Sequence, residues 1–190
     1  MVICVYGASS EIVDKKYIEA SEEMGKALAK REHDIVFGGG RQGLMGGVSR
    51  AALSAGNVKV TGVAPTFFDI PGILEKHCTD FIYTETMRER KQIMEEMSDA
   101  FIVLPGGIGT FEEFFEILTL KQLGRHAKPI AIFNAYGYYD DLIAMLEKTS
   151  DEKFMKEECL KIFKAFLDIE ELLDYVEAPE EVDVRHLKNI

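Results

Sequence analysis

The chain has 190 residues, 47% of them hydrophobic and 29% charged, which is typical of one globular domain with a full hydrophobic core. Acidic side chains outnumber basic ones by 33 to 22, and the net charge of -11 argues against binding to the phosphate backbone of nucleic acids. A small anionic ligand is compatible with this charge, because backbone dipoles and a few arginines act locally while salt screens distant charges.

Short apolar runs alternate along the chain with segments of helical spacing. Strands are predicted over residues 2–6, 34–37, 58–64, 81–84, 100–104, 129–134 and 162–167. Helices are predicted over residues 11–31, 42–56, 85–97, 109–123, 139–146 and 169–176. This alternation favours right-handed βαβ crossovers and an α/β fold, a Rossmann-like open parallel sheet with helices on both faces. We expect a single nucleotide-binding domain over residues 1–190.

Three turns that follow predicted strands are rich in small residues, at positions 7–10, 38–47 and 105–109. In an open parallel sheet, ligands bind outside the carboxyl ends of the strands, near the point where strand order reverses. We therefore expect the three turns to open at one edge of the sheet. The segment 65–71 is either a mobile flap over that edge or a structural loop.

The first glycine motif is Gly38-x-Gly40-x-x-Gly43, which matches the dinucleotide fingerprint. It follows the second strand, however, and no acidic residue near position 60 is placed to hold a ribose hydroxyl. No Gly-Lys-Ser/Thr follows, so the Walker pattern fails as well. The alternatives are a nucleotide or phosphate cradle of another kind and a tight strand-to-helix turn. The number of glycines favours the cradle.

The second motif joins Pro105-Gly106-Gly107-Ile108-Gly109 to Thr110 and Glu113. Glycines at a helix start expose backbone N–H groups, and the helix dipole makes such a start a seat for phosphate. Glu113 would lie one turn into the helix, beside whatever the phosphate carries. The alternative is that Thr110-x-x-Glu113 is a capping box, in which both side chains satisfy backbone N–H groups.

Arg90 lies in a predicted helix where Met87, Arg90, Met94 and Met97 form one stripe that should face the core. A buried arginine needs a partner, so Arg90 is a candidate for function, with a structural ion pair or a snorkelling side chain as alternatives.

In the helix after Thr110, Phe111, Phe114, Phe115 and Leu118 form a predicted core stripe. Ile117 and Leu120 form a second apolar line, and Glu113 projects with this second line, away from the phenylalanines. A helix that is apolar on two sides is buried on two sides, which predicts a homodimer with its interface beside the cleft. A central helix in a thick monomer is the alternative.

Cysteine and histidine positions give no sign of disulfides or metal ligation. Cys4, Cys78 and Cys159 are scattered and share no metal-ligand spacing, which predicts reduced thiols in the cytoplasm. The four histidines show no HxxH or HxxxH pairing, so no metal site is expected. The apolar start at residues 2–6 is too short for a signal or membrane segment.

The glycine motifs together with Met87-x-x-Arg90-Lys91 and Gly109-Thr110-x-x-Glu113 resemble the LONELY GUY (LOG) family of cytokinin riboside 5′-monophosphate phosphoribohydrolases. The resemblance runs from residue 2 to about residue 146 and implies a Rossmann-like dimer without a cofactor. It implies hydrolysis of the N-glycosidic bond of adenosine or cytokinin riboside 5′-monophosphates, including AMP, to free base and ribose 5-phosphate. By this resemblance Arg90 and Glu113 are catalytic, and the substrate-binding residues are Gly38, Gly39, Gly40, Gly43, Leu44, Met45, Met87, Pro105, Gly106, Gly107, Gly109 and Thr110.

Two other functions compete with this one. A non-hydrolytic nucleotide or molybdenum-cofactor carrier could use the same cradle, although a carrier has no need of a carboxylate near a phosphate. A true amino-acid decarboxylase needs a lysine that binds pyridoxal phosphate, and no lysine is marked for that role.

Overall fold

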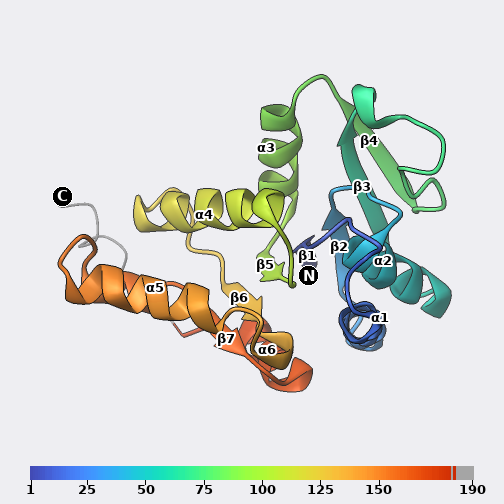
Figure 1. Cartoon of the computed structure of the whole chain (residues 1–190). Coiled ribbons are helices and arrows are strands. Elements are labelled where there is room, and N and C mark those ends of the chain that lie inside the picture. Colours follow the sequence, from blue (N-terminus) through green and yellow to red (C-terminus); the bar gives the residue numbers. More distant parts are fainter. Residues whose placement is uncertain (181, 183–190) are drawn as a thin grey trace.

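The computed structural model describes residues 1–180 and residue 182, which form a seven-stranded, all-parallel sheet with helices on both faces (Figure 1). The strands are β1 (Val2–Tyr6), β2 (Asp34–Phe37), β3 (Val60–Pro65), β4 (Asp80–Thr84), β5 (Ala100–Val103), β6 (Ile130–Phe133) and β7 (Lys164–Phe166). The helices are α1 (Lys15–Lys30), α2 (Gly43–Ala55), α3 (Met87–Met97), α4 (Ile108–Gln122), α5 (Asp140–Asp151) and α6 (Ile169–Glu177). Three short 3-10 helices complete the description: η1 (Thr66–Phe68), η2 (Ala135–Gly137) and η3 (Glu157–Lys161).

Every predicted element exists, and the differences lie at element ends. The helix predicted to start at residue 11 begins at Lys15, because the Asp14 side chain accepts a hydrogen bond from the Lys16 amide and caps it. Helix α5 continues beyond the predicted end at residue 146 to Asp151. Strand β7 is shorter than the predicted 162–167, because residue 162 still belongs to the end of η3.

The sheet separates two apolar cores, because neighbouring residues of a strand point to opposite faces. In β1, Ile3 and Val5 pack into the core with α1, α2 and α6, whereas Cys4 and Tyr6 pack into the core with α3, α4 and α5. Figure 1 shows α1 and α2 on one side of the sheet and α3 and α4 on the other. The predicted fold class is confirmed.

Strand order reverses at β1, which pairs with β2 on one side and with β5 on the other. The order is β4-β3-β2-β1-β5-β6-β7, so the chain builds one half of the sheet and then crosses over β1 to build the other. The turns after β1, β2 and β5 therefore open together at this reversal, as predicted.

The single domain predicted over residues 1–190 includes residues 181 and 183–190, which lie outside the described part, so it stays a prediction. Among the described residues, no helix is long and apolar enough to cross a membrane.

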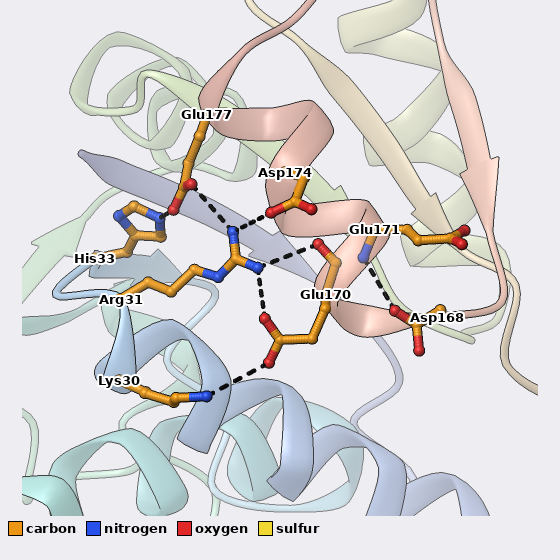
Figure 2. A network of polar contacts seen from close by, with 8 residues as sticks. All are labelled: Lys30, Arg31, His33, Asp168, Glu170, Glu171, Asp174 and Glu177. Carbon is orange, nitrogen blue, oxygen red and sulfur yellow. Dashed lines mark hydrogen bonds and ion pairs between the residues drawn. The ribbon is translucent and has the colours of Figure 1, made fainter.

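A polar network fastens helix α6 to the end of helix α1 (Figure 2). The Arg31 guanidinium contacts Asp174 at 2.7 Å, Glu177 at 3.0 Å and Glu170 at 2.5 Å. The ring nitrogen Nε2 of the buried His33 lies 2.8 Å from a second oxygen of Glu177. One arginine thus joins three carboxylates on successive turns of α6.

We expect Arg31→Gln to lower the free energy of unfolding by about 1 kcal/mol, the upper range for solvent-accessible ion pairs. The loss should shrink at high salt, because salt screens such pairs. Urea unfolding at low and high salt measures both effects. Lys15→Gln is the control, because among the described residues Lys15 forms one ion pair, with Glu19, and both side chains are largely exposed. Equal stability of the two variants would show that the network does not hold α6.

Candidate active site

A cleft of about 470 Å³ opens at the carboxyl edge of the sheet where strand order reverses. This volume lies within the range of pockets for small ligands, about 300–1,000 Å³. Its walls come from the turns after β1, β2 and β5, from the β3–β4 connection and from α3. The lining residues are Gly7, Ala8, Ser9, Ser10, Gly38, Gly40, Gln42, Met45, Phe68, Ile73, Leu74, Met87, Arg90, Gly107, Ile108, Gly109, Thr110, Glu112 and Glu113.

A buried ion pair between α3 and α4 forms the charged part of the cleft. Arg90 Nη2 donates to Glu113 Oε1 at 2.8 Å, and the two side chains are only 9% and 6% exposed. Arg90 Nε also donates to the carbonyl of Val63 in β3, at 3.2 Å. The two residues that the sequence marked separately therefore act as one unit.

Burial dominates the electrostatics of Glu113. Removal from water raises the pKa of its carboxyl group from 4.5 to about 7, and the charge of Glu112 adds to this effect. The neighbouring Arg90 guanidinium works in the opposite direction, because it favours the ionised carboxylate. A carboxyl with a pKa near neutrality exchanges a proton readily at physiological pH, as a general acid or base must.

Glu112 is a second carboxylate in the cleft, but it is already engaged. Lys91 on α3 forms ion pairs with Glu112 and Glu116 on α4. These two ion pairs tie the two helices together next to the Arg90–Glu113 pair. Of the two cleft carboxylates, Glu113 thus differs from Glu112 by its arginine partner and its raised pKa.

The turn after β2 reaches the cleft through unusual backbone geometry. Gly39 and Gly43 have φ angles of 72° and 59°, a region that favours glycine. A side chain on Gly43 would lie 2.5 Å from the Ala8 carbonyl, which itself accepts from the Leu44 amide at 2.9 Å. The turns after β1 and β2 are therefore locked together.

The β3–β4 connection is docked on the same glycine turn. The Arg41 amide donates to the Ile73 carbonyl, and the Glu75 amide donates to the Gly39 carbonyl, both at 2.9 Å. Of the two alternatives for the segment 65–71, the hydrogen bonds immediately after it favour a structural loop. It brings Phe68 to the cleft wall, and Ile73 follows.

The turn after β5 leads directly into α4 without a side-chain cap. Gly107 is the N-cap residue, and its carbonyl accepts from the Phe111 amide at 3.0 Å. Thr110 and Glu113 both lie inside the helix, so they do not form a capping box. The first backbone N–H groups of a helix have no partner within it, which leaves those of this turn available to an anion.

The predicted binding residues fall into two groups. Gly38, Gly40, Met45, Met87, Gly107, Gly109 and Thr110 line the cleft with Arg90 and Glu113. The others lie behind the wall and hold it: Gly39, Gly43, Leu44, Pro105 and Gly106. Leu44 is 1% exposed in the core. The predicted binding motifs therefore also contain residues that position the turns and do not line the cleft.

Two predictions about helix faces are wrong in part. Phe115 is 40% exposed and so does not belong to the core, and the buried face of α4 instead comprises Thr110, Glu113, Phe114, Ile117, Leu118 and Lys121. Met87, predicted on the core-facing stripe, is 37% exposed. It lies in the first turn of α3, beyond the edge of the sheet, and lines the cleft instead.

The sequence reasoning missed several lining residues, among them Gln42, Phe68, Ile73 and Ile108. Ile108 is 87% exposed, and its place inside the glycine motif was the one available signal. Phe68 and Ile73 belong to a connection whose path no local pattern specifies. In the described part of the chain, no group of three or more His, Cys, Asp or Glu side chains could hold a metal ion.

Gly38→Ala should displace Arg90, because the new Cβ would lie 2.0 Å from Arg90 Nη2. We expect the free energy of unfolding to fall by about 1–3 kcal/mol, as for other overpacked sites. Thermal or urea unfolding measures the change. Gly109→Ala is the control, since a Cβ there has no neighbour within 4 Å among the described residues. If both variants unfold like the original chain, Gly38 is not required for the position of Arg90.

Comparisons with known proteins place the chain among its relatives. The family model described as "Possible lysine decarboxylase" matches residues 45–176. The probable cytokinin riboside 5′-monophosphate phosphoribohydrolase LOGL6 of Oryza sativa subsp. japonica is 39% identical over 176 residues, covering 93% of this chain and 70% of the relative. The cytokinin riboside 5′-monophosphate phosphoribohydrolase of Rhodococcoides fascians is 41% identical over 140 residues, covering 74% and 71%.

Solved structures share the fold at lower identity. The molybdenum cofactor carrier protein of Chlamydomonas reinhardtii superposes with a TM-score of 0.70 at 19% identity, covering 93% of this chain and 95% of that one. The molybdenum cofactor binding protein of Rippkaea orientalis gives the same values. The length and identity of the sequence matches show that the chain belongs to the LOG family of cytokinin riboside 5′-monophosphate phosphoribohydrolases, whose family model carries the description "Possible lysine decarboxylase".

Proposed function

We propose that the protein hydrolyses the N-glycosidic bond of adenosine or cytokinin riboside 5′-monophosphates, AMP included, and releases the free base and ribose 5-phosphate. The observation that carries this proposal is the buried Arg90–Glu113 pair, which opens into the cleft beside the uncapped start of α4. The names of the relatives at 39% and 41% identity support it.

Glu113 would assist both halves of the reaction. As the ribosyl C–N bond breaks, positive charge builds on the sugar, and a nearby carboxylate stabilises that charge. The oxygen of a water molecule forms the new bond to the anomeric carbon and gives up a proton to Glu113. The base nitrogen keeps the electron pair of the broken bond and takes up a proton from water, and Glu113 returns its proton to water, so that overall one water molecule is consumed. Arg90 orients Glu113 through their 2.8 Å hydrogen bond.

The remaining wall would hold the rest of the nucleotide. The backbone N–H groups of Gly107, Ile108 and Gly109 at the start of α4 would bind the 5′-phosphate. Thr110 and the glycines after β2 would flank the ribose. A fixed phosphate anchor places the anomeric carbon near Glu113 and reduces the entropic cost of alignment.

Neither competing function has a specific observation in its favour. The likeness to molybdenum-cofactor proteins is at 19% identity and concerns the fold alone. A decarboxylase with pyridoxal phosphate does not fit, because no lysine is among the described residues that line the cleft. Lys121 is buried and its pKa is lowered to about 8 by burial, but it lies about two turns beyond Glu113 on α4.

The function is tested by incubating the protein with AMP, isopentenyladenosine monophosphate and adenosine and separating the products by chromatography. We expect free base and ribose 5-phosphate from the monophosphates and much less base from adenosine, which lacks the phosphate anchor. Retention of bound, intact AMP with no release of base would contradict hydrolysis and favour a carrier.

The catalytic pair is tested by Glu113→Gln and Arg90→Ala. Each should lower kcat by about 10²-fold or more, the scale for loss of a positioned charged or acid–base group. Glu116→Gln is the control, because this carboxylate lies one turn farther along α4, outside the cleft lining. Circular dichroism checks that the variants are folded. Rates like those of the unmodified chain in folded Glu113→Gln would remove the proposed role.

The raised pKa of Glu113 predicts the pH dependence of activity and stability. The carboxylate form is the active one, so kcat/KM should rise with pH through about 7. Stability should change in the opposite sense. Glu113 binds its proton more tightly in the folded state than in the unfolded chain. Its contribution to the free energy of unfolding therefore declines as pH rises from about 4.5 to about 7.

Both pH trends can be measured on the same preparations. The rising limb of kcat/KM should persist in Glu116→Gln. The difference in unfolding free energy between the unmodified chain and Glu113→Gln should shift in favour of the variant between pH 5 and pH 8. A flat rate profile over this range would contradict a titrating Glu113.

We further propose a cytoplasmic homodimer. Cys4, Cys78 and Cys159 are all free thiols, which suits a reducing compartment. Helix α4 carries the exposed apolar side chains Phe115 and Ile108 beside the cleft, and Leu123 follows its last turn. A second copy of the chain would cover them. A solution mass equal to one chain at micromolar concentration would contradict the dimer.

A further inference from the structure

Three consecutive carbonyls of the turn after β5 accept hydrogen bonds from outside the turn. Tyr139 Oη donates to the Leu104 carbonyl at 2.7 Å, and the Ala8 amide donates to the Pro105 carbonyl at 3.1 Å. Tyr138 Oη donates to the Gly106 carbonyl, also at 2.7 Å. These bonds fix the rotation of each peptide group immediately before α4.

The direction of a carbonyl determines the direction of the next N–H group. A trans peptide is planar, so its C=O and the following N–H point in opposite directions. The described peptides include no cis bond, so the Gly107 N–H points away from the Tyr138 hydroxyl. Gly107 lines the cleft and is the N-cap of α4, where N–H groups have no partner within the helix.

We propose that Tyr138 is a positioning residue for the phosphate seat. Its hydroxyl holds the peptide between Gly106 and Gly107 so that the Gly107 N–H is presented to the 5′-phosphate of the nucleotide. This inference rests on the proposed hydrolysis and deepens it, because it assigns phosphate affinity to a side chain that touches no substrate.

Tyr138 is 40% exposed, and the turn before it and the rings beside it restrict its position. The turn before it contains Tyr136 and Gly137 with φ angles of 58° and 72°, and a left-handed conformation at a tyrosine is uncommon. Asn134 stabilises this turn, because its side-chain oxygen accepts from the Tyr139 amide at 2.7 Å. Tyr17 on α1 packs edge-on against the Tyr138 ring, with centroids 5.7 Å apart.

The opposite side of the turn is equally constrained. A Cβ on Gly106 would lie 2.1 Å from Thr110 Oγ1, so the turn passes close to the Thr110 side chain. Thr110 is 3% exposed and lines the cleft. The peptide of Gly106 thus lies between a buried threonine and the Tyr138 hydroxyl, which leaves it little freedom to rotate.

Tyr139 provides a matched control within the same turn. Its hydroxyl makes a bond of the same length to a carbonyl of the same segment. The residue after that carbonyl is Pro105, however, and proline has no N–H group. Tyr139 therefore orients no donor toward the cleft. Tyr139 is also 1% exposed, so the loss of its hydroxyl should affect stability more than binding.

The experiment compares Tyr138→Phe and Tyr139→Phe, with Tyr136→Phe as a second control. Steady-state kinetics with AMP give kcat and KM, and inhibition by ribose 5-phosphate reports binding of the phosphate and ribose without the base. We expect Tyr138→Phe to raise KM and the inhibition constant by about 5- to 10-fold, the equivalent of one hydrogen bond, with kcat nearly unchanged. Both constants should stay within about 2-fold in Tyr139→Phe and Tyr136→Phe, although Tyr139→Phe should melt at a lower temperature.

Two results would overturn the role of Tyr138. One is an unchanged KM and inhibition constant in folded Tyr138→Phe, even if its melting temperature falls. The other is an equal rise of both constants in Tyr138→Phe and Tyr139→Phe, which would indicate general loosening of the turn.

Failure of the proposed hydrolysis is recognised separately, because the unmodified chain would then release no base. In that case calorimetric titration with ribose 5-phosphate tests Tyr138 directly. Weaker binding in Tyr138→Phe alone supports the role, whereas equal binding in all variants, or none in the unmodified chain, overturns it.

Discussion

The buried hydrogen-bonded ion pair between Arg90 and Glu113 is the interaction on which the rest of the site depends. An arginine charge removed from water needs a charged partner and further acceptors, and here these are Glu113 and the Val63 carbonyl. Burying such a pair costs desolvation energy that a hydrophobic pair would not cost. Removing one partner typically lowers the free energy of unfolding by about 3–5 kcal/mol, because the other charge stays buried without a partner. The protein thus keeps a stability liability at the point where its proposed chemistry takes place.

Glycine backbones make room for this pair and for a ligand beside it. Gly38 lies where any side chain would overlap the Arg90 guanidinium, and Gly106 lies where any side chain would overlap Thr110. The residues of each glycine motif therefore serve different purposes. Some residues face the cleft, while others let one turn pass close to another. A glycine motif marks places where the backbone packs closely against other groups, and only some of these groups belong to a ligand.

The fold, and Arg90 and Glu113 as candidates for function, could be predicted from the sequence because their signals are local. Apolar runs such as residues 2–6 and 34–37 coincide with β1 and β2. Arg90 interrupts an apolar helical stripe, and a charged side chain at such a buried position needs a partner. The wrong assignment of Phe115 to the core arose because α4 is largely apolar all round, so spacing alone could not select its buried face. The place of Phe68 in the cleft wall and the hydrogen bond from Tyr138 to Gly106 could not be predicted, because both depend on tertiary contacts between distant segments.

The central place of β1 has a consequence for how the protein is made. The cleft needs the turn after β1, the turn after β2 and the start of α4, yet β5 joins β1 nearly one hundred residues after β1 has been synthesised. Until that late pairing occurs, one edge of β1 lacks its neighbour and Arg90 has no carboxylate to meet. Nascent chains that stop short of α4 would contain β1 to β5, the first five of the seven strands, but no complete site. The site therefore cannot form before β5 has paired with β1 and α4 has followed it, so activity would report this late long-range pairing.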